Sequence, residues 1–442
     1  MTSIEDLTAK KLRDTLAEQL LRSRARSTAL TDAVDDGDLV RQHSVLMSPL
    51  VWDLAHIGNQ EELWLVRDVG GREPVRHDID DLYDAFQHAR ANRPALPLLS
   101  PVEARGYVRE VRDKVFGVLE RSPLEGRRLL ANGFAFNMIV QHEQQHAETM
   151  LATHQLRAGA PVLHARDPEP ATRPARTEVL VPAGEFTMGT STEPWALDNE
   201  RPAFRTHVDA FFIDTVPVSN GDYIRFIADG GYDDRRWWSD TGWGHRREAG
   251  LVAPRFWERD GDRWSRTRFG VVEPVPADEP VMHVCFHEAQ AYAAWAGRRL
   301  PTEPEWEKAA RFDPARGRSR RFPWGDDDPG PDHANLGQRH LRPAPVGSYP
   351  AGESALGVRQ LMGDVWEWVD SGFQPYPGFE VFPYPEYSKV FFGGDYKVLR
   401  GGSFGTDGTA VRGTFRNWDH PVRRQIFSGF RCARDAAPGE AR

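Results

Sequence analysis

A proline-rich stretch, residues 158–177, separates two parts of the chain that have different hydrophobic patterns. The stretch reads AGAPVLHARDPEPATRPART, and its four prolines and low apolar content are typical of an extended linker. A chain of 442 residues is longer than one hydrophobic core usually supports. We therefore predict one domain at residues 1–157, a linker at 158–177 and a second domain at 178–442.

The first part has the pattern of a helical bundle. Ser48-Pro49 and the capping box Ser100-Pro101-Val102-Glu103 mark two helix starts, and Gly70-Gly71 marks a stop. Residues 133–157 carry an apolar stripe at helical spacing. Together with the N-terminal segment, these signals predict four long helices that pack as a bundle.

The second part consists of short alternating or apolar runs, such as EVLVPAGEFTMG and KVLRGGSF, broken by Gly, Pro, Asn and Asp. Helical patterns occur near residues 220–229 and 287–297. This texture predicts a loop-rich α+β domain, so the fold class of the whole chain is multi-domain, α and α+β.

Composition and charge exclude several classes of protein. The net charge of −9 and the lack of a long lysine or arginine run argue against nucleic-acid binding. No eighteen apolar residues run together, and the mixed-charge N-terminal segment is unlike a secretory signal. The two cysteines, Cys285 and Cys432, are too few for a disulfide framework. We expect a cytoplasmic monomer with no membrane partner.

His142 and His146 stand four residues apart in a predicted helix, so both imidazoles leave the same face and can reach one metal ion. The segment HEQQH also matches the HExxH pattern of zinc hydrolases, in which Glu143 would activate a metal-bound water. That class expects a further ligand downstream, where this chain runs into the proline-rich stretch. A solvated or hydrogen-bonded histidine pair is the structural alternative.

A third ligand is available upstream. His56 lies among apolar residues of the predicted helix that follows Pro49, in VWDLAHIGNQEELWLV. Facing helices that both point histidine inward are a usual way for bundles to build metal sites. Three neutral imidazoles suit Fe(II), Zn(II) or Cu(II), so the ligands do not name the metal. A second pair, His283 and His287, spans an extended run and a helix start, and we predict a structural role for it.

The second half resembles the formylglycine-generating-enzyme, or sulfatase-modifying-factor, family over about residues 178–435. The similarity rests on ordered motifs: VPAGEFTMGT, DNERPAF, FIDTVPVSNGDY, GRRLPTEPEWEKAAR, FPWGD, MGDVWEWV, LRGGSF and GFRCARD. It implies an irregular C-type-lectin-like fold. The cysteine pair that the family's oxidases carry after RGGS is missing from RGGSFGTDGTAVRGTFRNW, so we do not expect their cysteine chemistry.

The first half resembles the DinB-like four-helix domains, whose metal sites use three histidines. The order of the two halves is similar to that of the iron-dependent sulfoxide synthases of ergothioneine biosynthesis, with matches at WDLAHIGNQEELW, HEQQHAETML, YKVLRGGSF and FRNWDHPVRRQIF. This resemblance implies Fe(II) held by His56, His142 and His146. It also implies a reaction that uses O2 to join γ-glutamylcysteine to hercynine, Nα-trimethylhistidine, as a sulfoxide.

The same resemblance implies roles for further residues. Tyr384 would donate a proton during the oxygen chemistry, and the ring of Tyr387 would lie near the trimethylammonium group. The remaining assignments are Asn417, Trp418 and Gln145 for hercynine, and Arg90, Arg93, Asp419 and Arg423 for the γ-glutamyl group.

Three alternatives stay open. The first is the same chemistry with free cysteine or with the regiochemistry of ovothiol synthesis. The second is the HExxH zinc hydrolase. The third is a binding module without catalysis, because lectin-like domains often only bind. Metal analysis separates the last two from an iron enzyme.

Overall fold

The computed structural model describes residues 4–175, 177–437 and 439–440. The chain divides into two compact units, the first ending at Leu163 and the second beginning at His164. The division falls within the proline-rich stretch. From His164 onward this stretch belongs to the second unit. There the Arg166 carbonyl accepts from His340 Nδ1 at 2.9 Å, and Asp167 pairs with Arg342 at 2.9 Å.

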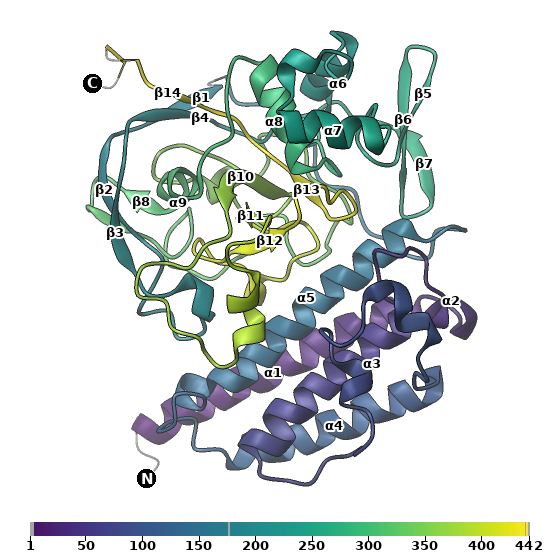
Figure 1. The fold of residues 1–442 in the computed structure, drawn as a ribbon. Coiled ribbons are helices and arrows are strands. Elements are labelled where there is room, and N and C mark those ends of the chain that lie inside the picture. Colours follow the sequence, from purple (N-terminus) through teal and green to yellow (C-terminus); the bar gives the residue numbers. More distant parts are fainter. Residues whose placement is uncertain (1–3, 176, 438, 441–442) are drawn as a thin grey trace. The chain divides into compact units, whose positions relative to one another are not determined.

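The first unit is helical. Its α-helices are α1 (Ile4–Asp32), α2 (Asp36–Val40), α3 (Leu50–Glu61), α4 (Pro101–Arg121) and α5 (Phe134–Leu156). Helix α3 continues directly into the π-helical segment η1 (Glu62–Val69). Within this unit α1 packs against α5, and α3 packs against both α4 and α5 (Figure 1). The four predicted long helices are therefore confirmed.

The helix boundaries follow the sequence signals at two of three places. The capping box at Ser100 and Glu103 forms as predicted, and Gly70 is the C-cap residue that follows η1. Ser48 differs, because α3 begins at Leu50 and Pro49 occupies the N-cap position. The Ser48 hydroxyl instead accepts a hydrogen bond from Arg93 at 2.6 Å. The sequence pattern predicts that the Ser48 hydroxyl caps the start of α3, but in the structure this hydroxyl bonds to Arg93, which is distant in the sequence.

The second unit mixes short strands and helices. Its α-helices are α6 (Asn220–Ala228), α7 (Asp240–Glu248), α8 (Phe286–Trp295) and α9 (Glu303–Arg311). Its strands are β1 (Glu178–Val181), β2 (Gly184–Met188), β3 (Phe204–Val208), β4 (Phe211–Asp214), β5 (Trp257–Asp260), β6 (Arg263–Arg268), β7 (Val271–Pro274), β8 (Phe312–Asp313), β9 (Arg318–Ser319), β10 (Trp366–Gly372), β11 (Lys397–Arg400), β12 (Asn417–Asp419), β13 (Ser428–Gly429) and β14 (Ala433–Asp435).

The strands form small sheets rather than one continuous sheet. A three-stranded sheet has the order β1-β4-β14, and a four-stranded sheet has the order β12-β11-β10-β13. Antiparallel pairing places Val398 opposite Trp418, so β12 lies along β11. Helices α6 and α7 pack against α8 (Figure 1). The two helices predicted in this part of the chain correspond to α6 and α8, and the α+β prediction is confirmed.

Buried ion pairs hold the interior of the second unit together. Arg400 of β11 is fully buried and bonds Glu303 and Glu307 at 2.7 and 2.8 Å. Arg431 pairs with Glu367 of β10 at 2.7 Å. Breaking a buried pair of this kind is strongly destabilising, because it leaves one charge without its partner. The motifs LRGGSF, MGDVWEWV and GFRCARD therefore contribute charges to the core of the fold.

No helix in the described part of the chain is long and apolar enough to span a membrane. Cys285 and Cys432 are both buried, and neither takes part in a disulfide.

Candidate metal centre

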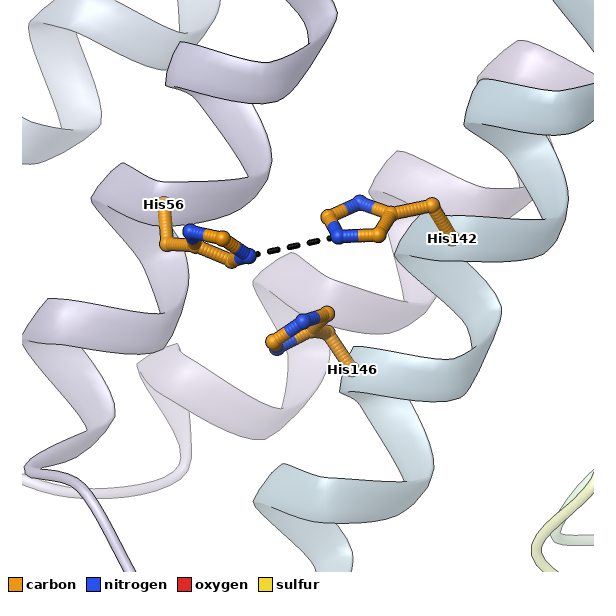
Figure 2. Close-up of side chains that lie close together, drawn as sticks. All are labelled: His56, His142 and His146. Carbon is orange, nitrogen blue, oxygen red and sulfur yellow. Dashed lines mark hydrogen bonds between the residues drawn. The ribbon is translucent and has the colours of Figure 1, made fainter. Parts of the chain in front are cut away.

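Three imidazole rings converge between helices of the first unit, with His56 buried and His142 and His146 partly exposed. His56 comes from α3, and His142 and His146 come from successive turns of α5, the helix that packs against α3. One ring nitrogen from each residue lies within 4.8 Å of the other two. Figure 2 shows the three rings turned toward one another, with 3.2 Å between the Nε2 atoms of His56 and His142.

Hydrogen bonds orient two of the three rings. The Nδ1–H group of His56 donates to the backbone carbonyl of Tyr83 at 2.7 Å, and Nδ1 of His146 lies 3.0 Å from a carboxylate oxygen of Asp53. A neutral imidazole that donates through Nδ1 presents a lone pair at Nε2. Metal-binding histidines are usually tethered in this way to a carbonyl or a carboxylate. Both rings therefore offer Nε2 to a common point.

His56 and His142 are held in the neutral form that a metal requires. Burial lowers the pKa of His56 well below its usual range, and the neighbouring histidines lower it further. Burial and His146 lower the pKa of His142 in the same direction. At neutral pH these two rings carry no charge, so binding a cation would not first require the loss of a proton.

The spacing of the nitrogens fits one ion. Nitrogens bound at about 2.1 Å in neighbouring positions of a metal lie roughly 3 Å apart, close to the 3.2 Å between His56 and His142. The Nδ1 atom of His142 is buried and has no hydrogen-bond partner in the described structure. Three nitrogen ligands leave open positions on an octahedral ion for exogenous ligands.

Glu143 faces a different set of partners. Its carboxylate accepts from Ser23, from Arg24 at 2.7 Å and from Arg112 at 2.6 Å. Burial alone would raise the pKa of Glu143, but the two guanidinium groups lower it to about 2. A zinc hydrolase needs this glutamate free to take a proton from a metal-bound water. Because Glu143 is held in these ion pairs, it is not free to act as the general base that the zinc-hydrolase interpretation requires.

Arg93 and Trp52 pack together beside His56. Trp52 stacks on His56 with 4.7 Å between ring centroids and 13° between the planes, and the Arg93 guanidinium lies 3.5 Å above the Trp52 ring. Arg93 is 4% exposed and also bonds the carbonyls of His88 and Ala85. Burial lowers the pKa of Arg93 to about 10, so the side chain stays charged at neutral pH.

The other two residues of this unit that were predicted to bind substrate are more accessible to solvent. Arg90 begins the 3-10 helix η3 (Arg90–Ala95), is exposed and donates to the Leu46 carbonyl at 2.9 Å. Gln145 is partly buried on α5, one residue before His146.

The predicted residues of the second unit form a group of their own. The Tyr384 and Tyr387 rings meet edge to face at 6.2 Å, and Tyr387 meets the edge of Trp418 at 5.9 Å. Trp418 lies in β12, between Asn417 and Asp419, and stacks on Phe373 at 4.2 Å. Arg423 forms an ion pair with Asp419 at 3.4 Å. The structure thus brings together the residues predicted near residue 384 and near residue 417.

The groups that tether the histidines were not predicted from the sequence. Asp53 precedes His56 by three residues, in WDLAH, so helical spacing places both on one face of α3 and could have indicated a shared site. Trp52 and Tyr83 gave no comparable signal. Tyr83 holds His56 through its backbone carbonyl, at the end of the 3-10 helix η2 (Asp81–Tyr83). Every residue has such a carbonyl, so the residue type at position 83 could not have indicated this contact. His283, predicted to be structural, donates through Nδ1 toward the carbonyls of Arg424 and Ile426.

Comparison with known families covers both units. Residues 164–436 match the sulfatase-modifying factor enzyme 1-like domain, and residues 19–150 match the DinB superfamily. The chain is 54% identical to the hercynine oxygenase of Mycolicibacterium smegmatis, over 96% of this chain and 99% of that protein. It is 55% identical to that of Mycobacterium tuberculosis, over 95% and 98%.

These matches agree with the observed architecture of a helical unit followed by a C-type-lectin-like α+β unit. The family resemblance inferred from the motifs is therefore confirmed. The chain belongs to the hercynine oxygenase family and is an oxygenase enzyme that carries a three-histidine centre.

Proposed function

We propose that this enzyme is a non-haem Fe(II) sulfoxide synthase of ergothioneine biosynthesis that joins γ-glutamylcysteine to hercynine. The observation that carries the proposal is the cluster of His56, His142 and His146, with two rings tethered through Nδ1. Ligands of this type leave open positions for exogenous groups, and family membership supports hercynine as one substrate.

The electrons of the proposed reaction balance without another reductant. Forming the carbon–sulfur bond releases two electrons and oxygenating the sulfur releases two more. Together they reduce O2 completely, with one oxygen atom in the sulfoxide and the other in water. Fe(II) at the three histidines would supply O2 activation and a position at which the thiol binds as thiolate. The chain needs no further redox cofactor.

The side chains of the second unit bind hercynine and supply a proton in this proposal. Burial raises the pKa of Tyr384, and the Asp198 carboxylate raises it further, so the phenol keeps its proton at neutral pH and can donate it. The ring of Tyr387 lies near the trimethylammonium group of hercynine in this proposal, because an aromatic face attracts a quaternary cation, and Trp418 lies beside Asn417 in β12. Asn417 and Gln145 donate to the hercynine carboxylate.

The γ-glutamyl group carries carboxylates and an ammonium. Arg90 and Arg93 bind the carboxylates in this proposal, and the Asp419–Arg423 pair provides both signs of charge. Three of the five N–H donors of the Arg93 guanidinium already bond to the protein.

The two buried thiols, Cys285 and Cys432, are consistent with a cytoplasmic location.

One experiment tests the function directly. The protein is reconstituted with Fe(II) without oxygen and mixed with hercynine and γ-glutamylcysteine. Air is then admitted, and the products are identified by mass spectrometry. We expect the sulfoxide conjugate, its absence with His56→Ala, and slower turnover with free cysteine than with γ-glutamylcysteine. Efficient turnover of cysteine would favour the alternative thiol, and full activity of His56→Ala would contradict the metal centre.

The role of Tyr384 is tested by the choice of product. Tyr384→Phe keeps the ring, so iron and substrates should still bind, while the loss of the hydroxyl should divert oxidation from the conjugate toward the sulfinic acid of the thiol. Both products are measured for Tyr384→Phe and Tyr387→Phe. A shift only in Tyr387→Phe would reassign the proton donor, and no shift in either variant would remove tyrosine from the mechanism.

A further inference from the structure

The motif DNERPAF has no role in the proposed reaction, yet it lies against the segment that carries both tyrosines. Its first residues form the 3-10 helix η5 (Asp198–Glu200). Asp198 is 1% exposed, and its carboxylate is directed at a part of the chain almost two hundred residues away in sequence. A buried carboxylate in this position needs partners, because its desolvation is costly.

The partners of Asp198 lie at the two ends of segment 382–388. The Ser388 hydroxyl donates to Oδ1 of Asp198, and the Phe382 N–H donates to Oδ2 at 3.4 Å. Ser388 is fully buried. Tyr384 and Tyr387 lie between these two anchoring points, so one side chain fixes both ends of the short segment that contains them.

Helix η5 is itself held rigidly. The fully buried Glu200 accepts from Arg412 at 2.6 and 3.0 Å and from Thr414 at 2.6 Å. The Asn199 carbonyl accepts from Arg416 at 3.0 Å. Arg416 immediately precedes β12, the strand that carries Asn417 and Trp418. Helix η5 therefore connects the tyrosine-bearing segment on one side to the strand with the remaining predicted hercynine contacts on the other.

The bonds of Asp198 are charge-assisted at neutral pH. Burial raises the pKa of the Asp198 carboxyl to about 6, while the Ser388 hydroxyl and the Phe382 and Asn199 N–H groups oppose that rise. The group is thus ionised near pH 7, where hydrogen bonds to a carboxylate are stronger than those between neutral groups.

We propose that Asp198 is a positioning residue that clamps segment 382–388 to η5 and thereby fixes the position of the Tyr384 hydroxyl. The role of Tyr384 in this statement rests on the proposed function, whereas the clamp rests on the contacts of Asp198 alone. Asp198 acts through the segment and does not touch the substrate.

The clamp is tested first by proteolysis of the full-length protein. Lys389 is exposed directly after Ser388, so trypsin cleavage after Lys389 reports on the release of the segment. We expect Asp198→Asn and Ser388→Ala each to accelerate this cleavage about tenfold, because each loses a charge-assisted hydrogen bond. Asp313→Asn is the control for the loss of a buried carboxylate elsewhere in the unit, since Asp313 ties a different turn through the Ala315 and Arg316 N–H groups and also pairs with Arg316 and Arg320.

The functional consequence is tested by the ratio of sulfoxide to sulfinic acid. Asp198→Asn should bind iron normally and shift the products in the direction of Tyr384→Phe, and the double variant should show no further shift. Ser388→Ala should give a smaller shift in the same direction. Wild-type cleavage rates and product ratios in both variants would overturn the proposal.

If the unaltered protein forms no sulfoxide, the proposed function fails, and the cleavage rates alone decide whether Asp198 clamps the segment. A product shift without faster cleavage would also overturn the clamp, because Asp198 would then act by another route.

Discussion

At the scale of single residues, the candidate metal centre includes groups that orient the histidines as well as the histidines themselves. Asp53 is 1% exposed and accepts from His146 through one oxygen. Trp52 supports His56 by stacking, and the Arg93 guanidinium also packs on the Trp52 ring. The three ligands could be inferred from helical spacing and resemblance. Their supports could not, because stacking and carbonyl contacts depend on how segments distant in sequence meet.

Asp53→Ala should weaken Fe(II) binding about 10–100-fold, because the His146 ring loses the partner that fixes its Nδ1 proton. Asp53→Asn should have a smaller effect, since its amide oxygen can still accept. Affinity is measured without oxygen by competition with a chelator. Asp113→Ala, which removes one exposed carboxylate from α4, serves as the control and should bind iron normally. Unchanged affinity in Asp53→Ala would show that the contact has no influence on the metal.

Arg90→Ala and Arg93→Ala should behave differently although the two residues lie only three positions apart. Arg90 is exposed, so its loss should raise the KM for γ-glutamylcysteine, with little change in iron affinity or melting temperature. Arg93→Ala should raise the same KM and also weaken iron binding, because Trp52 loses its stacked cation and buried acceptors lose their donor, a cost of about 1–3 kcal/mol. Identical behaviour of the two variants in all three measurements would refute this division.

At the scale of secondary structure, periodicity and caps located the helices of the first unit well. The exception at Ser48 has a physical cause, since its hydroxyl is taken by Arg93 and Pro49 becomes the N-cap residue. Local signals assume that a polar side chain serves its own helix. Such signals fail where tertiary packing brings a charged donor from elsewhere in the chain, such as Arg93, to the polar side chain.

Helices α1 and α5 are joined by a contact that should make stability depend on pH. His154 of α5 donates through Nε2 to the Leu30 carbonyl at 2.9 Å and is 3% exposed. Burial lowers its pKa to about 4, although the Leu30 bond opposes this shift. Between pH 6.5 and about 4 the unfolded chain binds a proton at His154 that the folded protein does not. The folded state should therefore lose stability as pH falls through this window, by at most about 1.4 kcal/mol per unit.

Urea unfolding of the metal-free protein at pH 7, 5.5 and 4.5 measures this dependence. His56 and His142 contribute in the same direction, so the informative quantity is the difference between the wild type and His154→Gln, whose amide can still donate to Leu30. The variant should lose less stability than the wild type on acidification. Parallel curves would mean that His154 does not carry the effect.

At the scale of the whole molecule, the change of pattern at the proline-rich stretch was enough to predict an α unit followed by an α+β unit. The order of the strands in the sheets of the second unit could not be predicted from the sequence. Strand β14 pairs with β4, whose residues lie more than two hundred positions earlier, and β13 pairs in parallel with β10. Such pairings are set by the packing of the core and the buried arginine–glutamate network, and no local pattern specifies them.

The division into two units, with all three histidines in the first, predicts that metal stabilises the units unequally. A ligand that binds only the folded state stabilises it by RT ln(1 + [L]/Kd), about 2.7 kcal/mol at one hundred times Kd. For a unit of this size that amounts to roughly 5–10 °C in melting temperature. Anaerobic Fe(II) should therefore raise the unfolding transition of residues 4–163 and leave that of the second unit unchanged.

Calorimetry of the full chain, with hydrogen exchange to assign each transition to its peptides, provides the measurement. His142→Ala should abolish the shift without altering the second transition, because only a ligand is lost. Equal protection of both units by Fe(II) would contradict a centre confined to the helical unit, since stabilisation by binding reaches only the structure that unfolds together with the site.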